Sequence, residues 1–208
     1  MRHAWILAAA LAASTAAHAA PSSYRYDPVH SQIIFSVTHN GFSRSLGRLH
    51  VASGTLLFDD KDWTRSSTDL TIDLSKVDMG DAGWSKAVRG NDFFASDRAA
   101  TARYVSTSVE KRSDNEGVIH GNLTLRGVTR PVDVSFRLNR VARTIYGMHT
   151  IAGFSGTATL DRTAFGMTSH TGSIGTDVAV MLEIEAIRTD DTPASASPTQ
   201  ETPRGATQ

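Results

Sequence analysis

The chain has 208 residues, with 21 basic and 21 acidic side chains and no cysteine. This charge balance, without a basic stripe, argues against a nucleic-acid partner. The absence of cysteine excludes disulfides and membrane attachment through a lipidated cysteine, so the fold must be stabilised by its hydrophobic core alone.

Residues 1–19 have the features of a signal peptide. A short positive start, Met1–His3, precedes the alanine-rich run Ala4–Ala17, which is too short to span a bilayer as a helix. The small residues in Ala17–Ala19 predict cleavage after Ala19. Together with the alanine bias and the absence of cysteine, this signal favours export to a bacterial periplasm.

Residues 20–188 form one predicted domain that is rich in strand patterns. Apolar and polar residues alternate with period two, and turn residues separate the alternating runs. Gly54 interrupts one run and predicts a bulge or kink, and Gly127–Pro131 is expected to turn the chain. The predicted strands are Gln32–Thr38, Arg48–Phe58, Thr68–Leu74, Thr101–Glu110, Val118–Arg126, Val132–Leu138, Phe154–Leu160 and Asp177–Ile187.

The segment Asp81–Arg89 lacks alternation and predicts a short helix with Trp84 and Val88 on one side. Asn91–Phe94 follows and is expected to pack as a plug on one end of the sheet. No comparable amphipathic helix covers the apolar strand faces, so the sheet is expected to close on itself. The stretch Thr189–Gln208 has no large apolar residue and predicts a disordered tail.

Patterns for catalysis or metal binding are weak in this sequence. No two histidines have the His-x-x-x-His spacing, and no cysteine assists them, so no metal site is predicted. Gly153–Gly156 is one residue short of a nucleophile elbow. Ser31 beside His30 is not by itself a catalytic dyad. We therefore expect no catalytic residue and no enzyme activity.

A series of short motifs, in a fixed order, resembles the YceI-like family. The motifs are Asp27–Ser31 with Phe35 and His39, then Gly47 and Gly54, Phe58–Asp59, Asp92–Phe94, Gly121–Val132, Arg162 with Phe165–Gly166, and Gly175–Val178. Together they extend over roughly residues 24–187. The chain departs from the family at Leu49, where phenylalanine is usual, and at Tyr104, whose hydroxyl needs a partner if it points inward.

The resemblance implies an all-β fold, an extended antiparallel lipocalin-like β-barrel with one short helical segment near residues 81–90 and a lipophilic tunnel. Periodicity alone favours a core filled by side chains over a tunnel lined for a ligand. The resemblance to the family favours the tunnel instead. Asp161 and Arg162 are expected to be a polar pair that holds the fold, with Arg162 satisfying turn carbonyls or closing one barrel end. His39 is the candidate contact for a ligand head group. The residues expected to line the tunnel are Ile33, Phe35, Val37, Leu70, Ile72, Leu123, Leu125, Val134, Phe136, Phe154, Val180 and Leu182.

The function that the resemblance implies is a soluble periplasmic carrier for a long apolar lipid, such as a polyisoprenoid or the tail of an isoprenoid quinone. The lipid is the expected partner, and no cofactor is expected other than such a bound quinone or polyprenyl lipid. Transient membrane contact and a homodimer are further expectations. Two alternatives stay open: a quinone-linked redox accessory or catalyst with His39 at the tunnel mouth, and a barrel with a filled core that binds a protein partner or serves a stress response.

Overall fold

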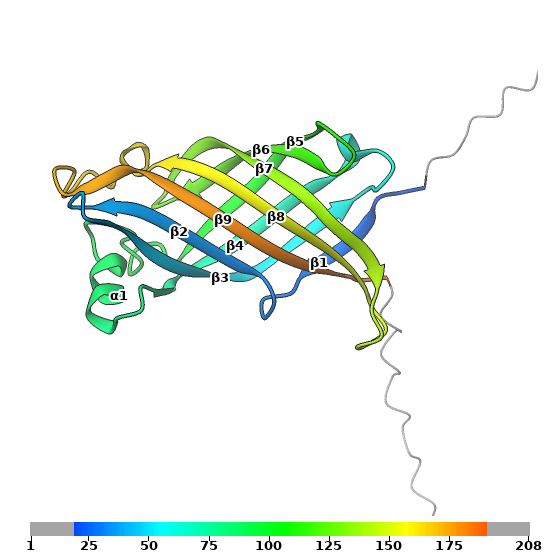
Figure 1. Ribbon diagram of the computed structural model, residues 1–208, viewed down its shortest axis with the longest axis horizontal. Coiled ribbons are helices and arrows are strands. Elements are labelled where there is room, and N and C mark those ends of the chain that lie inside the picture. The colour runs from blue at the N-terminus through cyan, green and yellow to red at the C-terminus, as the bar shows by residue number, and fades with distance from the viewer. Residues whose placement is uncertain (1–18, 191–208) are drawn as a thin grey trace, which may run out of the picture.

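The computed structural model describes residues 19–190 and contains strands, one α-helix and two short 3-10 helices (Figure 1). Alternating apolar residues make the strands, as the sequence predicts. The strands are β1 (Ser22–Tyr26), β2 (Gln32–His39), β3 (Ser43–Phe58), β4 (Ser67–Asp78), β5 (Thr101–Lys111), β6 (Glu116–Leu125), β7 (Val128–Arg143), β8 (Thr150–Asp161) and β9 (Ile174–Arg188). The helices are η1 (Trp63–Arg65), α1 (Ala82–Arg89) and η2 (Arg162–Phe165).

The strands form one antiparallel sheet that closes into a barrel. The hydrogen-bonded order is β3-β2-β9-β8-β7-β6-β5-β4, and β4 pairs again with β3. The short β1 pairs with both β3 and β9, so it occupies the same place in the ring as β2. Closure leaves no free edge and turns the apolar strand faces inward. The predicted all-β antiparallel barrel is therefore confirmed.

The break between β1 and β2 lies at the motif Asp27–Ser31. Tyr26 is in register with Ala186, whereas Gln32 is in register with Glu183, so the chain loops out between them. The Ser31 hydroxyl donates to the Glu185 carbonyl at 3.1 Å and accepts from the Glu185 amide at 3.2 Å. A side chain thus replaces the missing backbone pairing and keeps the barrel wall continuous.

All eight predicted strands are present, most of them longer at the ends than the alternation indicates. The prediction of a turn at Gly127–Pro131 is wrong. The turn is only Arg126 and Gly127, both with positive φ (55° and 79°), and β7 begins at Val128. Pro131 lies inside β7 and pairs with Asn122 of β6, while the register between β7 and β8 begins only at Ser135. Proline is tolerated where a strand has a neighbour on one side only.

The predicted helix is α1, and the predicted plug follows it. Asp81 caps the helix, because its carboxylate accepts a hydrogen bond from the Trp84 amide at 2.8 Å. Phe94 is buried, and its ring meets the Phe35 ring edge-on at a centroid distance of 5.9 Å. The helix and the segment after it lie across one end of the barrel (Figure 1).

Gly54 lies beside a register shift between Val51 and Ser53 of β3, which agrees with the predicted irregularity. A Cβ atom at Gly54 would lie 2.5 Å from the Asp69 carbonyl oxygen and 2.8 Å from the Tyr26 ring. The close approach of the neighbouring strand and ring requires glycine here.

The predicted signal peptide lies almost entirely outside the described residues, as does the tail beyond Asp190. Thr189, which the sequence places in the tail, donates its backbone N–H to the Ser23 carbonyl at 2.9 Å. The helices between residues 19 and 190 are all too short or too polar to cross a membrane.

Candidate functional site: an apolar cavity inside the barrel

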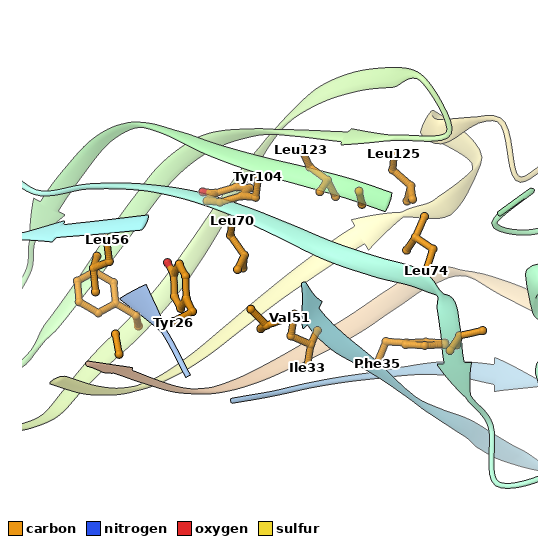
Figure 2. Packing of buried hydrophobic residues seen from close by; sticks show 14 of the residues in the cluster. Tyr26, Ile33, Phe35, Val51, Leu56, Leu70, Leu74, Tyr104, Leu123 and Leu125 are labelled. Atoms are coloured by element: carbon orange, nitrogen blue, oxygen red, sulfur yellow. The ribbon is translucent and has the colours of Figure 1, made fainter. Parts of the chain in front are cut away.

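The barrel encloses a cavity of about 240 Å³ lined by side chains from every strand, from α1 and from η2. Figure 2 shows Ile33 and Phe35 of β2, Leu70 of β4 and Leu123 of β6 pointing toward this shared interior. The twelve residues that the sequence predicts for the tunnel all line it: Ile33, Phe35, Val37, Leu70, Ile72, Leu123, Leu125, Val134, Phe136, Phe154, Val180 and Leu182. Their contact with a ligand stays a prediction.

The two sides of the cavity differ in how tightly they are packed. Inward side chains of β2 and β4, such as Ile33 (2 % exposed) and Leu74 (1 % exposed), are covered by neighbours. Inward side chains of β7, β8 and β9, such as Val134, Leu160 and Val180, are only half-buried although they line the interior. In a filled core these residues would be fully covered. The interior is therefore hollow along β7–β9, which argues against the filled-core interpretation.

Glycines opposite large rings leave room for this lumen. A Cβ atom on Gly117 would lie 2.8 Å from the Phe136 ring, and one on Gly121 would lie 2.5 Å from the Tyr104 ring. Each ring therefore rests against the backbone of the neighbouring strand and does not project across the barrel. The sequence shows these glycines, but which ring covers each glycine is known only from the pairing of β6 with β5 and β7.

Tyr104 points inward, and its hydroxyl has the hydrogen-bond partners that an inward position requires. Its hydroxyl lies 3.0 Å from the carbonyl oxygens of both Ile119 and Val132. Burial raises the pKa of the Tyr104 phenol, with a further contribution from Asp133. Tyr26 is a second inward tyrosine, and its hydroxyl is bonded to the Thr68 hydroxyl. Burial raises the pKa of Tyr26 to about 12.

Arg162 holds one end of the barrel together, as the sequence predicts. Its guanidinium is buried (3 % exposed) and donates to the carbonyl oxygens of Gly175 and Ile174, each at 2.8 Å, and to that of Met167. Burial lowers the pKa of Arg162, against the opposing effect of Asp161. Asp161 itself faces solvent and caps η2 by accepting from the Thr163 amide at 2.8 Å.

The cavity reaches the protein surface beside α1. Trp84 lines the cavity and yet is 40 % exposed, and its ring lies edge-on to the His39 ring at a centroid distance of 5.7 Å. His39 also lines the cavity, so the predicted head-group residue stands at this opening. Phe42, in the turn after β2, is 92 % exposed at the same end.

The opposite end of the barrel is filled by the core. Tyr24, Ala152 and Ala186 are almost fully buried, lie on the paired strands β1, β8 and β9, and do not line the cavity. Trp63 of η1 is 2 % exposed and packs against the Phe136 ring at 5.2 Å. The lumen is therefore a long, thin pocket with its opening at the α1 end.

The other candidates for chemistry lie outside the cavity. His30 binds the Asp27 carboxylate at 2.8 Å, and this hydrogen bond raises the pKa of His30. Asp27, His30 and Glu185 place one potential metal-ligating atom each within 4.8 Å of one another, but on the outer side of the barrel wall. Ser31 bonds the backbone of Glu185, and Ser155 lies in β8 and donates to Glu183 at 2.7 Å. Neither serine is bonded to a histidine in the part of the chain that is described.

Sequence reasoning missed several cavity-lining residues. Leu49 and Leu56 lie on the long β3, where the register shift obscures the alternation. Phe93, Met79 and Met167 come from the segments that cross the open end, which have no period to reveal their direction. The aromatic pair at the plug was the only local signal for this group.

Comparison with known proteins agrees with this architecture. The profile of the YceI-like domain matches residues 24–186. A UPF0312 protein of Shewanella putrefaciens is 33 % identical over 183 residues, which cover 88 % of this chain and 95 % of the relative. A UPF0312 protein of Shewanella oneidensis has the same identity and coverage.

Two solved structures have the same fold. BcnA of Burkholderia cenocepacia superposes with a TM-score of 0.67 at 21 % identity, covering 77 % of this chain and 98 % of BcnA. A polyisoprenoid binding domain of Saccharophagus degradans has a TM-score of 0.63 at 14 % identity, covering 80 % of this chain and 99 % of that domain. With the profile match spanning nearly the whole barrel, this chain belongs to the YceI-like domain family.

Proposed function

We propose that this protein binds a long apolar lipid of the polyisoprenoid class in the barrel cavity and carries it through the periplasm. The observation that carries the proposal is the lumen itself, which is lined by apolar side chains along the barrel and opens at one end. The polyisoprenoid binding domain of Saccharophagus degradans, which has the same fold, supports this ligand class.

The dimensions of the lumen favour a chain-like ligand. Residues from His39 at the opening to Phe58 and Phe136 near the filled end line it, yet its volume is only about 240 Å³. Pockets for compact ligands usually measure roughly 300–1,000 Å³. A slender hydrocarbon chain therefore fits better than a bulky ring system, and a very long chain requires the half-buried residues of β7–β9 to move outward.

Chain length sets whether the protein retains its ligand. At about −0.3 kcal/mol per ligand atom, a chain of ~20 carbons gains about −6 kcal/mol, and a chain of ~40 carbons about −12 kcal/mol. The first value corresponds to a dissociation constant of tens of micromolar, and the second to nanomolar binding. A carrier that keeps its cargo during transit therefore requires the longer chains.

Binding is favoured over catalysis by the state of the polar groups inside the barrel. The hydroxyls of Tyr26 and Tyr104 and the guanidinium of Arg162 are engaged with other protein groups. The exposed Phe42 and Trp84 at the opening suit brief contact with a bilayer, because aromatic side chains favour the membrane–water interface.

Extraction of the purified protein with organic solvent, followed by mass spectrometry, tests the proposal. Material prepared without detergent from a periplasmic fraction is expected to contain a prenyl-chain lipid close to one molecule per protein. A preparation that contains no lipid, and that takes none up from vesicles carrying a long-chain prenyl lipid, would contradict the carrier function. Detection of a quinone together with redox turnover that is lost in His39→Ala would favour the redox accessory instead.

A further inference from the structure

We infer that the open end of the cavity is a head-group subsite, in which Ser45 and His39 hydrogen-bond the oxygen-bearing head of a lipid that enters tail first. This inference rests on the proposed lipid-binding function and specifies both the orientation and the chemical class of the ligand.

In the inner part of the cavity, the hydroxyls of Tyr26, Ser66, Thr68 and Tyr104 are each already bonded to another protein group. Tyr26 donates to the Thr68 hydroxyl, which in turn donates to the Thr55 carbonyl at 3.3 Å. The Tyr104 hydroxyl is held by two carbonyl oxygens, and the Ser66 hydroxyl accepts from the Asp59 amide at 3.0 Å. A polar head placed there would lose its hydrogen bonds to water without replacement.

Ser45 is the exception among these buried residues. It is 5 % exposed, lines the cavity and is in register with the inward residue Val37. Within residues 19–190 the Ser45 hydroxyl has no hydrogen-bond partner. Its oxygen is also not fully enclosed by other atoms, so part of its surface is accessible. The hydroxyl therefore faces the open space of the cavity, where an incoming group can bond to it.

His39 stands next to Ser45 on the neighbouring strand. His39 is in register with Ser43, so Ser45 is its diagonal neighbour on the same inward face. The Cα atoms of such diagonal neighbours are roughly 7–8 Å apart. One ring nitrogen, Nε2, lies 3.3 Å from the Asn40 amide nitrogen, and Nδ1 has no partner in the described chain. One head group of the size of a hydroxyl or a small ring can bridge the two side chains.

The charge at this end selects the chemistry of the head. The Arg162 guanidinium bonds the carbonyl of Ile174, and Ile174 is in register with His39. Among the described residues no carboxylate lies within ion-pair distance of Arg162, and its guanidinium donates to the carbonyl oxygens of Gly175, Met167 and Ile174. A buried positive charge favours electron-rich oxygen and disfavours an ammonium group. The subsite therefore suits an alcohol, phenol, quinone or acid head and not an amine.

A matched ligand series tests the inference. Delipidated protein is titrated with geranylgeraniol, with geranylgeranylamine and with the C20 hydrocarbon that lacks a head, each by displacement of a fluorescent fatty probe. The alcohol is expected to bind about threefold to tenfold more tightly than the hydrocarbon, as one or two hydrogen bonds predict. The amine is expected to bind no more tightly than the hydrocarbon.

Two serine variants locate the effect. Ser45→Ala is expected to remove most of the preference for the alcohol and to leave hydrocarbon binding and melting temperature unchanged. Ser67→Ala is the matched control, because Ser67 also borders the cavity but is exposed on β4. Equal binding of alcohol and hydrocarbon by the wild type, or an equal loss in both variants, overturns the subsite while the carrier function stands. Failure of all three ligands to bind, in protein that also takes up no ~40-carbon prenyl lipid from vesicles, overturns the carrier function itself.

Discussion

The ring of Phe35 in β2 lies against the backbone of Gly47, its register partner in β3. A Cβ atom added to Gly47 would lie 2.3 Å from the ring. The ring is held between this backbone and the edge of Phe94 from the plug. Phe35 thereby forms part of the cavity wall at the open end without blocking the lumen.

Gly47→Ala is expected to destabilise the fold and to narrow the lumen, because the new methyl group displaces the Phe35 ring. Overpacking of this kind costs about 1–3 kcal/mol. Urea unfolding measures the loss, and lipid uptake measures the narrowing. Gly153→Ala in β8 is the matched control, since the nearest atom to its Cβ is the Arg140 carbonyl oxygen at 3.9 Å. Equal effects of the two variants would show that the contact with Phe35 is not responsible.

Val134→Phe is expected to abolish lipid uptake with less than about 1.5 kcal/mol loss of stability, because the new ring enters space that is not filled by side chains. Val134 is half-buried and lines the cavity. Ser135→Phe places the same ring on the outer face of β7 and should leave uptake intact. Strong destabilisation by Val134→Phe in protein that carries no lipid would restore the filled-core interpretation.

Alkaline stability is expected to depend on Tyr26. Its pKa is raised from 10.0 to about 12 in the folded protein, so the folded state keeps its proton longer than the unfolded state. The contribution of protonated Tyr26 to the free energy of unfolding is fully present below pH 10. It is lost as the pH rises from 10 to 12, and the loss is at most about 2–3 kcal/mol. Tyr26→Phe should make this decline shallower in urea unfolding measured at several pH values, and the part that remains is due to Tyr104, whose pKa burial also raises. Tyr146→Phe, at an 82 % exposed position, should not change it.

Two truncations should distinguish the contribution of Thr189 to stability from that of the residues after it. Removal of residues 191–208 is expected to leave the melting temperature and the lipid content unchanged, because this stretch has no large apolar residue. Removal from Thr189 onward also deletes its hydrogen bond to Ser23, which is worth about 0.5–1.5 kcal/mol. A drop of several degrees with the shorter truncation would show that the tail docks on the barrel.

Export is expected to remove residues 1–19. N-terminal sequencing of periplasmic protein should begin at Ala20, because Ala17 and Ala19 occupy the small positions before the cleavage site. Full-length chain recovered only from the cytoplasm would contradict both the cleavage and the proposed location.

Local patterns were sufficient to predict the type of most elements. Period-two alternation in Thr68–Leu74 and Val132–Leu138 fixes both the strand and its inward face, since side chains alternate along any strand. Asp81 marks the start of α1 because its side chain caps the helix. The absence of a covering helix predicts closure, because an apolar sheet face must be buried.

Only the tertiary structure decided whether the interior is full or hollow, because packing depends on which residues meet across strands. Gly121 and Tyr104 are 17 positions apart, and no local pattern shows that the ring covers the glycine. The same holds for Pro131, whose place inside β7 depends on where pairing with β8 begins. The free hydroxyl of Ser45 stands out only when the partners of the other buried polar groups are known. Alternation is a property of one segment, whereas a lumen and its polar end arise from contacts among all the strands.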